Sequence, residues 1–129
     1  MEKQDKTKVR AKKPINRNTW VKTKLRSASL LWPARAEAIK AARAERGKYK
    51  CAECRELFIR SQIQLDHINP VVDPKSGWTN FDDFINRLFC DAEGFRVLCR
   101  QCHDSITQIQ DSMRSYYAKK RKEEQWNLN

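Results

Sequence analysis

The chain has 129 residues, of which 27 are Lys or Arg and 16 are Asp or Glu, so its formal net charge is +11. This length suits one compact domain with tails and is too short for two large domains. The longest apolar stretch without a charge, residues 27–34, is far below the ~20 residues that span a bilayer, so a membrane protein is not expected. The first 26 residues carry scattered Lys and Arg and no apolar core, which argues against a signal peptide and predicts a cytoplasmic protein.

The positive charge is concentrated in the N-terminal part of the chain. Residues 1–50 contain 16 basic and 4 acidic side chains, whereas residues 51–110 contain 6 and 9. Residues 1–32 are rich in Lys and Arg, with little apolar periodicity before residue 26, so we predict a flexible basic arm there. Such an arm can bind DNA by displacing counterions from phosphates, with an affinity that falls as salt rises. The alternative is a solvated tail that only keeps the protein soluble.

Residues 33–121 are predicted to form one α+β domain, followed by a C-terminal tail over residues 122–129. Pro33 suits a first helical position, and the Ala-rich stretch after it predicts a helix over residues 33–46 with Gly47 as its C-cap. Residues 48–67 predict a small antiparallel hairpin with a Cys-containing turn and an alternating strand at 61–65. The Asn, Asp, Pro and Gly residues of 69–77 then predict a loop.

The second half of the domain is predicted to be helix, strand and helix. Four apolar residues at helical spacing predict a helix over residues 80–89, with Thr79 as its cap. Residues 95–98 predict a strand, and residues 101–121 a long third helix. Its apolar face is expected to consist of Ile106, Ile109, Met113 and Tyr117.

Four of the five cysteines form two Cys-x-x-Cys pairs, separated by 44 residues. Two such pairs supply the four thiolates of a structural zinc site, and metal binding stabilises a domain whose core is small. Disulfides are the alternative, which a reducing cytoplasm disfavours. We therefore predict a zinc ion bound by Cys51, Cys54, Cys99 and Cys102, with Cys90 left out as a buried helical thiol.

Both histidines of the chain stand next to motif residues. His67 follows Asp66 at the end of a predicted strand, and His103 directly follows Cys102. A carboxylate and an imidazole can bind a divalent cation, and a second imidazole can take a proton from water, so these residues could together hydrolyse a phosphodiester. The alternative for an isolated Asp-His pair is a helix cap or a core hydrogen bond. A shared zinc site would bring His103 close to the strand that carries Asp66 and His67.

Taken together, these motifs resemble the HNH endonucleases, and in particular their small, zinc-containing, phage-encoded members. The resemblance covers about residues 35–110 and does not include the N-terminal arm. It rests on Cys51-Ala52-Glu53-Cys54, then Leu65-Asp66-His67-Ile68-Asn69-Pro70, then Gly94-Phe95-Arg96-Val97-Leu98-Cys99-Arg100-Gln101-Cys102-His103, in the family's order.

The resemblance implies a ββα-metal fold with a four-cysteine zinc clip, preceded by a helix and the basic arm. It implies that His67 is the general base and that Asp66 and His103 hold a catalytic Mg²⁺ or another divalent ion such as Mn²⁺ or Ni²⁺. Double-stranded DNA would be the substrate, with the third helix in or near its minor groove. A monomer in the cytoplasm of a phage-infected host is expected, and DNA-packaging proteins are partners of some family members.

The chain departs from the family pattern in two places. Gly94 replaces the usual Asn that braces the metal loop, and Asn69, Asn80 or Asn86 could substitute for it. Ile106 and Thr107 stand where the family often has Lys-Thr, which removes one phosphate contact.

Several cations near the motifs are candidates for DNA contacts, although each could equally belong to a solvated surface. The basic run of residues 119–122 could extend the footprint or favour a helix C-terminus electrostatically. We expect a metal-dependent DNA endonuclease; the alternatives are a zinc-stabilised DNA-binding module that has lost catalysis and a purely structural phage protein. The predicted DNA-binding residues are Arg55, Arg60, Arg96 and Arg100.

Overall fold

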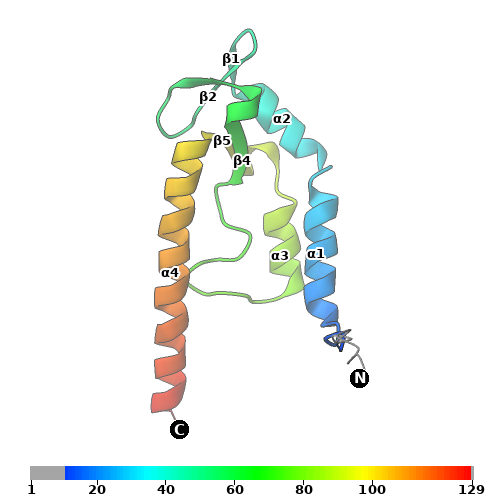
Figure 1. Ribbon diagram of the computed structural model, residues 1–129, viewed down its shortest axis with the longest axis vertical. Helices are drawn as coiled ribbons and strands as arrows, with labels where there is room; N and C mark the ends of the chain where they lie inside the picture. The colour runs from blue at the N-terminus through cyan, green and yellow to red at the C-terminus, as the bar shows by residue number, and fades with distance from the viewer. Residues whose placement is uncertain (1–10, 129) are drawn as a thin grey trace, which may run out of the picture.

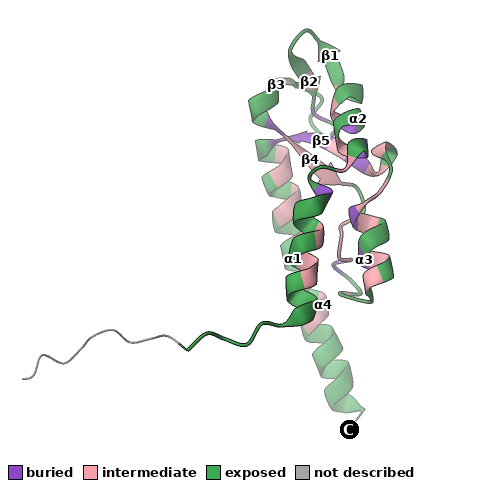
Figure 2. Cartoon of the chain, turned by 90° about the vertical axis from the view of Figure 1, so that its right-hand side faces the viewer, coloured by how far each residue is buried: buried purple, intermediate pink, exposed green. Residues whose placement is uncertain are grey.

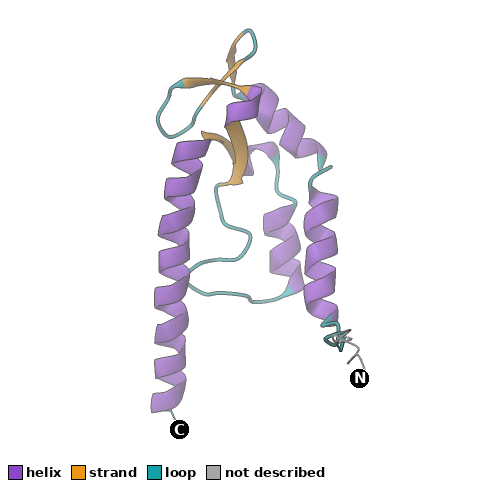
Figure 3. Ribbon diagram, in the orientation of Figure 1, coloured by secondary structure: helices purple, strands orange, loops and turns teal. Residues whose placement is uncertain are grey.

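The computed structural model describes residues 11–128, and over that range the chain is an α+β protein of four α-helices and two small antiparallel sheets (Figure 1). Two short 3₁₀ turns, Arg60–Gln62 and Ala92–Gly94, lead into strands. Figure 3 shows how the strands gather at one end of the molecule while the helices extend from it. The elements in chain order are α1 (Arg17–Ser29), α2 (Pro33–Ala41), β1 (Arg43–Glu45), β2 (Lys48–Lys50), β3 (Leu57–Ile59), β4 (Ile63–His67), α3 (Phe81–Leu88), β5 (Phe95–Cys99) and α4 (Arg100–Asn127).

The two sheets divide the predicted motifs between them. One sheet has the order β1-β2-β3, and the turn between β2 and β3 carries the first Cys pair. The other pairs β4 with β5, so that Ile63 lies opposite Cys99 and Asp66 lies opposite Arg96. The predicted strand at 61–65 therefore begins later, at Ile63, because residues 60–62 form a 3₁₀ turn. Its partner is β5 rather than the neighbouring strand of the hairpin.

Buried side chains lie around β5 and the elements that cover it (Figure 2). One cluster joins Ala34 and Ala38 of α2 to Phe95, with Trp32 and Leu65 packed against it. Small alanines on α2 allow that helix to lie close to the sheet. A second cluster contains Cys51, Leu98 and Cys99, so the cysteine motif is itself part of the core.

Helix α1 lies within the segment predicted to be a flexible arm, so that prediction is wrong for residues 17–29. Asn16 begins the helix by accepting a hydrogen bond from the Thr19 N–H at 3.1 Å. Cation-π contacts then attach the helix to α3 and the loop before it: the Lys22 Nζ lies 4.2 Å from the centre of the Trp78 ring, and the Arg26 guanidinium 5.4 Å from that of Phe84. These partners are distant in sequence. The part of the predicted arm over residues 1–10 lies outside the described residues.

The helix predicted over residues 33–46 is shorter than expected. Helix α2 ends at Ala41, and residues 43–45 instead form β1, which pairs with β2 across a tight turn. Gly47 adopts a φ of +72° in that turn, so it is a hairpin glycine rather than a helix cap. The Lys50 N–H donates to the Ala42 carbonyl at 3.0 Å, which continues the pairing beyond the start of β1.

The two later helices form where they are predicted, with differences at their ends and faces. Helix α3 is capped by Asn80, which accepts from the Asp83 N–H at 2.8 Å, whereas Thr79 donates to the Asp83 carboxylate. Helix α4 continues through the predicted tail to Asn127. Ile109 is 61% exposed, so the expected apolar face is only partly covered. Among the described residues, no helix combines the length and apolarity needed to cross a membrane.

Candidate functional site

The four paired cysteines come together at the junction of the two sheets. Their Sγ atoms all lie within 4.8 Å of one another, although the two pairs are far apart in sequence. Four thiolates in a tetrahedron around Zn²⁺, each ~2.3 Å from it, would be separated by about 3.8 Å, so this cluster could hold a metal ion such as zinc. The backbone positions it: the Cys99 N–H donates to Cys51 Sγ at 3.3 Å, and the Cys102 N–H to Cys99 Sγ at 3.5 Å.

The electrostatics of this cluster favour a bound cation. Burial disfavours the thiolate of Cys51, but N–H groups of Cys99, Cys54 and Glu53 donate to it and lower its pKa to about 6. The neighbouring Cys99 thiol, followed by burial, raises the pKa of Cys102 to about 12. Four adjacent sulfurs cannot all ionise without a compensating positive charge, and a divalent metal ion supplies it.

Cys90 lies outside this cluster, in agreement with the sequence prediction. It lies after the end of α3 rather than in a helix, and its thiol is half-buried against the cluster of α2 and Phe95, so the expected buried helical position is wrong. Burial, with the nearby Asp91 carboxylate acting in the same direction, raises the pKa of the Cys90 thiol. It therefore behaves as a packing residue.

His67 ends β4, and its ring is held in a defined orientation. The Nε2 atom lies 3.0 Å from the Leu88 carbonyl oxygen, and the ring centre lies 4.7 Å from that of Phe95. A carbonyl can only accept, so Nε2 carries the proton when the ring is neutral, and Nδ1 is left as a basic lone pair. Burial lowers the pKa of His67 below its usual value; the positive charges of Arg35 and Arg26 act in the same direction, against the Leu88 carbonyl and Asp66. The ring is thus neutral near pH 7, as a general base requires.

Asp66, the residue before His67 in β4, has an ion-pair partner on the neighbouring strand. The Arg96 Nε lies 3.1 Å from Asp66 Oδ2, as their opposite positions in the β4–β5 pairing allow. Arg96, which the sequence predicts to bind DNA, therefore pairs with the Asp66 carboxylate instead. Oδ1 takes no part in that hydrogen bond, so Asp66 retains an oxygen suited to a hard divalent cation.

His103 lies in the first turns of α4, the helix that packs against β4 and β5. Its Nδ1 is the one buried side-chain nitrogen or oxygen without a hydrogen-bond partner over residues 11–128. Asp104 Oδ1 lies 3.7 Å from this nitrogen, beyond hydrogen-bond distance. A buried, unpartnered imidazole nitrogen is costly unless a ligand binds it, so this donor fits a metal-binding role.

A cleft opens beside the end of β4. Its lining residues belong to α1, to β4 and the loop that follows it, and to α4. In Figure 1, α1 and α4 lie on either side of that loop. His103 is not among the residues that line the cleft. The lining residues are Arg26, Asp66, His67, Pro70, Val71, Val72, Gln110 and Arg114.

Gly94, which stands where the resemblance to the HNH endonucleases predicts an Asn, contacts the chain next to His67 through its main chain. Its carbonyl accepts the N–H of Ile68, the residue after His67, at 2.9 Å. A side chain at this position would force Cys90 to shift, because its Cβ would lie 2.7 Å from Cys90 Sγ. Of the Asn residues considered as substitutes, Asn80 is occupied as the cap of α3.

The predicted DNA-binding arginines do not line this cleft; Arg55 lies in the cysteine turn, Arg60 precedes β4 and Arg100 begins α4. The cleft contains two other arginines, Arg26 and Arg114, that the sequence prediction missed. Arg114 follows Gln110 by one helical turn, so helical spacing could have identified it once Gln110 was placed. Nothing in the sequence brings Arg26 to the site, because its position depends on how α1 packs.

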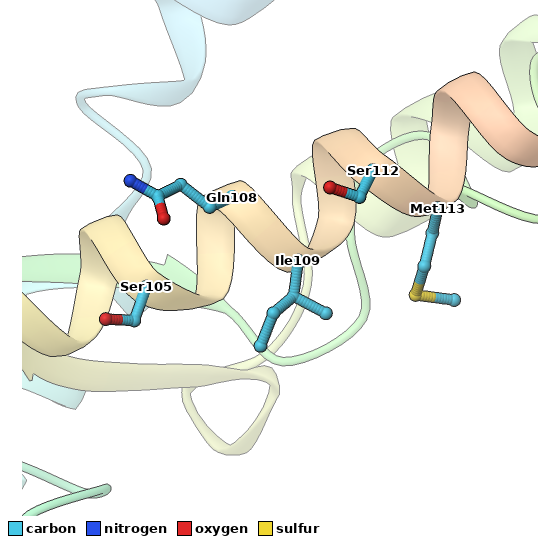
Figure 4. Close-up of a pocket in the computed structure, with 5 residues that line it drawn as sticks. All are labelled: Ser105, Gln108, Ile109, Ser112 and Met113. Atoms are coloured by element: carbon cyan, nitrogen blue, oxygen red, sulfur yellow. The ribbon is translucent and has the colours of Figure 1, made fainter.

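A second hollow lies on the exposed side of α4 (Figure 4). It is lined by Ser105, Gln108, Ile109, Ser112 and Met113, none of which titrates near neutral pH, so it offers no acid-base or metal chemistry.

Comparison with known proteins adds no assignment: no family model, curated protein or solved structure matches this chain.

Proposed function

We propose that this protein is a metal-dependent DNA endonuclease that hydrolyses phosphodiester bonds with His67 as the general base. The observation that carries the proposal is the orientation of the His67 ring. Its Nε2 is hydrogen-bonded to the Leu88 carbonyl, which leaves Nδ1 as the basic nitrogen. His67 lines a cleft together with Asp66, Arg26 and Arg114. The order of motifs that resembles the HNH endonucleases supports the same reaction.

In this proposal the chain's residues have separate roles. His67 takes a proton from water at Nδ1 as the water oxygen bonds to phosphorus and the bond from phosphorus to one sugar oxygen breaks. The departing oxygen takes a proton from solvent, and His67 later releases its own. Asp66 and His103 would hold a divalent ion, which supplies positive charge to stabilise the developing charge on the phosphate. The cysteine cluster would hold a separate structural Zn²⁺.

The test is nicking of supercoiled plasmid by the full-length protein with Mg²⁺, Mn²⁺ or Ni²⁺, beside an EDTA control. His67→Ala should lower the nicking rate by ~10²-fold or more, as expected for loss of a general base, while the melting temperature and DNA affinity stay near those of the wild type. His67→Gln is a matched variant that retains a polar side chain but cannot accept the proton. A variant that nicks at the wild-type rate would contradict the role of His67.

A wild-type protein that is folded and metal-loaded, yet leaves plasmid intact with every ion, would contradict the proposed enzyme. Binding of a duplex by the same sample would then favour a DNA-binding module. Metal analysis of the purified protein tests the zinc assignment separately, with about one Zn²⁺ per chain as the expected result.

A further inference from the structure

The arginines of the cleft suggest how DNA is held there. Arg26 comes from α1 and Arg114 from α4, and both line the cleft with Asp66 and His67. The two helices lie on either side of the segment that follows β4 (Figure 1). Residues 35–110, over which the HNH resemblance extends, include neither of them. The cleft is therefore completed by a helix and a helical extension that lie outside that motif.

Neighbouring side chains hold each arginine without neutralising the cleft. The Arg26 guanidinium lies over the Phe84 ring, which leaves its N–H groups available to an acceptor. Arg114 Nη1 is 2.7 Å from Asp111 Oδ1, a pair in which the side chains are 42% and 64% exposed. Exposed pairs of this kind are weak, so a phosphate can compete for Arg114 at little cost.

The chemistry of these groups identifies the ligand. A guanidinium presents planar N–H groups that match phosphate oxygens, and two from different helices can contact one strand together. Elsewhere on α1, Arg17, Lys22 and Lys24 extend the positive charge along the same helix. A phosphodiester backbone fits this arrangement better than a single small anion, because the charge continues beyond the cleft.

We propose that Arg26 and Arg114 form a two-sided clamp that binds the DNA backbone across the cleft and positions a phosphodiester beside His67. This inference rests on the proposed endonuclease function and adds α1 as a DNA-binding element. The clamp residues are positioning residues, since they act by holding the phosphate against the base rather than by transferring a proton.

Single-turnover nicking and duplex affinity, measured on the full chain, separate positioning from general electrostatics. Arg26→Gln and Arg114→Gln should each lower the single-turnover rate at saturating protein at least tenfold. Lys40→Gln on α2 and Arg46→Gln in the β1–β2 turn remove the same charge at exposed positions outside the cleft and should change that rate less than twofold. All four substitutions should weaken DNA binding modestly, because each removes one positive charge that attracts the DNA phosphates. Arg26→Lys should recover part of the loss, and all variants should melt within a few degrees of the wild type.

A second measurement does not depend on activity. In ¹⁵N NMR spectra of the metal-loaded protein, recorded with a short DNA duplex and no added Mg²⁺, the Nε–H signals of Arg26 and Arg114 should shift more than that of Arg17. If the wild type fails to nick but these signals shift, the endonuclease is refuted and the clamp stands. The clamp is refuted and the endonuclease stands under a different result. In that result the wild type nicks, Arg26→Gln and Arg114→Gln nick equally well, and the wild-type Nε–H signals of Arg26 and Arg114 do not move when DNA is added.

Discussion

Gly94 shows how one atom can decide which residue a position accepts. An added Cβ would lie 2.7 Å from Cys90 Sγ and 2.9 Å from Cys90 Cβ, closer than real Cβ contacts. Meanwhile the Gly94 carbonyl already accepts the Ile68 N–H, the contact that fixes the chain just after His67. The position thus requires a small residue for packing and uses its main chain for bracing.

We therefore predict that Gly94→Ala destabilises the protein by about 1–3 kcal/mol, as overpacking of a tight contact does. Gly94→Asn, which introduces the residue that the HNH resemblance predicts here, should be at least as destabilising and should not raise nicking activity. Chemical denaturation of both variants measures the free energy of unfolding. In a Cys90→Gly background, which removes both clashing atoms, the cost of Gly94→Ala should shrink. A Gly94→Asn protein of wild-type stability and higher activity would contradict this account.

Among the helices and strands, the sequence predicts those whose formation depends on residues within the same segment. Helix α3 and strand β5 form close to the predicted residues because apolar spacing and a polar cap lie within those segments. Helix α1 was missed because its attachment depends on Lys22 and Arg26 meeting aromatic rings more than 50 residues away. For the same reason the sequence indicated Asp66, His67 and the cysteines, but not Arg26 as part of the site.

The C-terminal half of α4 is attached to the body of the protein through the loop that follows β4. Arg121 Nη1 donates to the Lys75 carbonyl, and the Lys75 Nζ lies 5.9 Å from the centre of the Tyr117 ring. Gly77 allows this approach, since its φ is +75° and a Cβ there would lie 3.0 Å from Arg121 Nη2. Helix and loop therefore support each other at a distance from the core.

Arg121→Ala should release this contact. We expect faster amide hydrogen exchange in residues 73–77 and in the turns of α4 near residue 121, with a loss of global stability below about 1 kcal/mol because the contact is exposed. Lys119→Ala, which removes an exposed cation from the same helix, is the matched control. Equal exchange in the two variants would show that the loop is held by other contacts.

For the molecule as a whole, the cysteine cluster links the pieces that the sequence separates. Cys51 and Cys54 belong to the β2–β3 turn, whereas Cys99 ends β5 and Cys102 lies in the first turn of α4. Cys51 and Cys99 are also core residues, packed with Leu98. A metal ion in this cluster would therefore hold together the two sheets and the helix that walls the cleft.

Removal of that ion should consequently unfold the protein rather than only inactivate it. The net stability of a domain this size is about 5–15 kcal/mol, and the apparent free energy of metal binding to such cysteine sets is of the same order. We predict that a strong chelator, or Cys51→Ser, abolishes the cooperative thermal transition seen by circular dichroism. Cys90→Ser, at the thiol outside the cluster, should keep it, because that residue only packs. With the catalytic ion resupplied in excess after zinc removal, nicking should not return, since the cleft depends on α4 being docked. A melting curve that is unchanged after metal analysis confirms complete removal would mean that the apolar core alone sustains the fold, and that the four sulfurs are brought together by packing around Leu98.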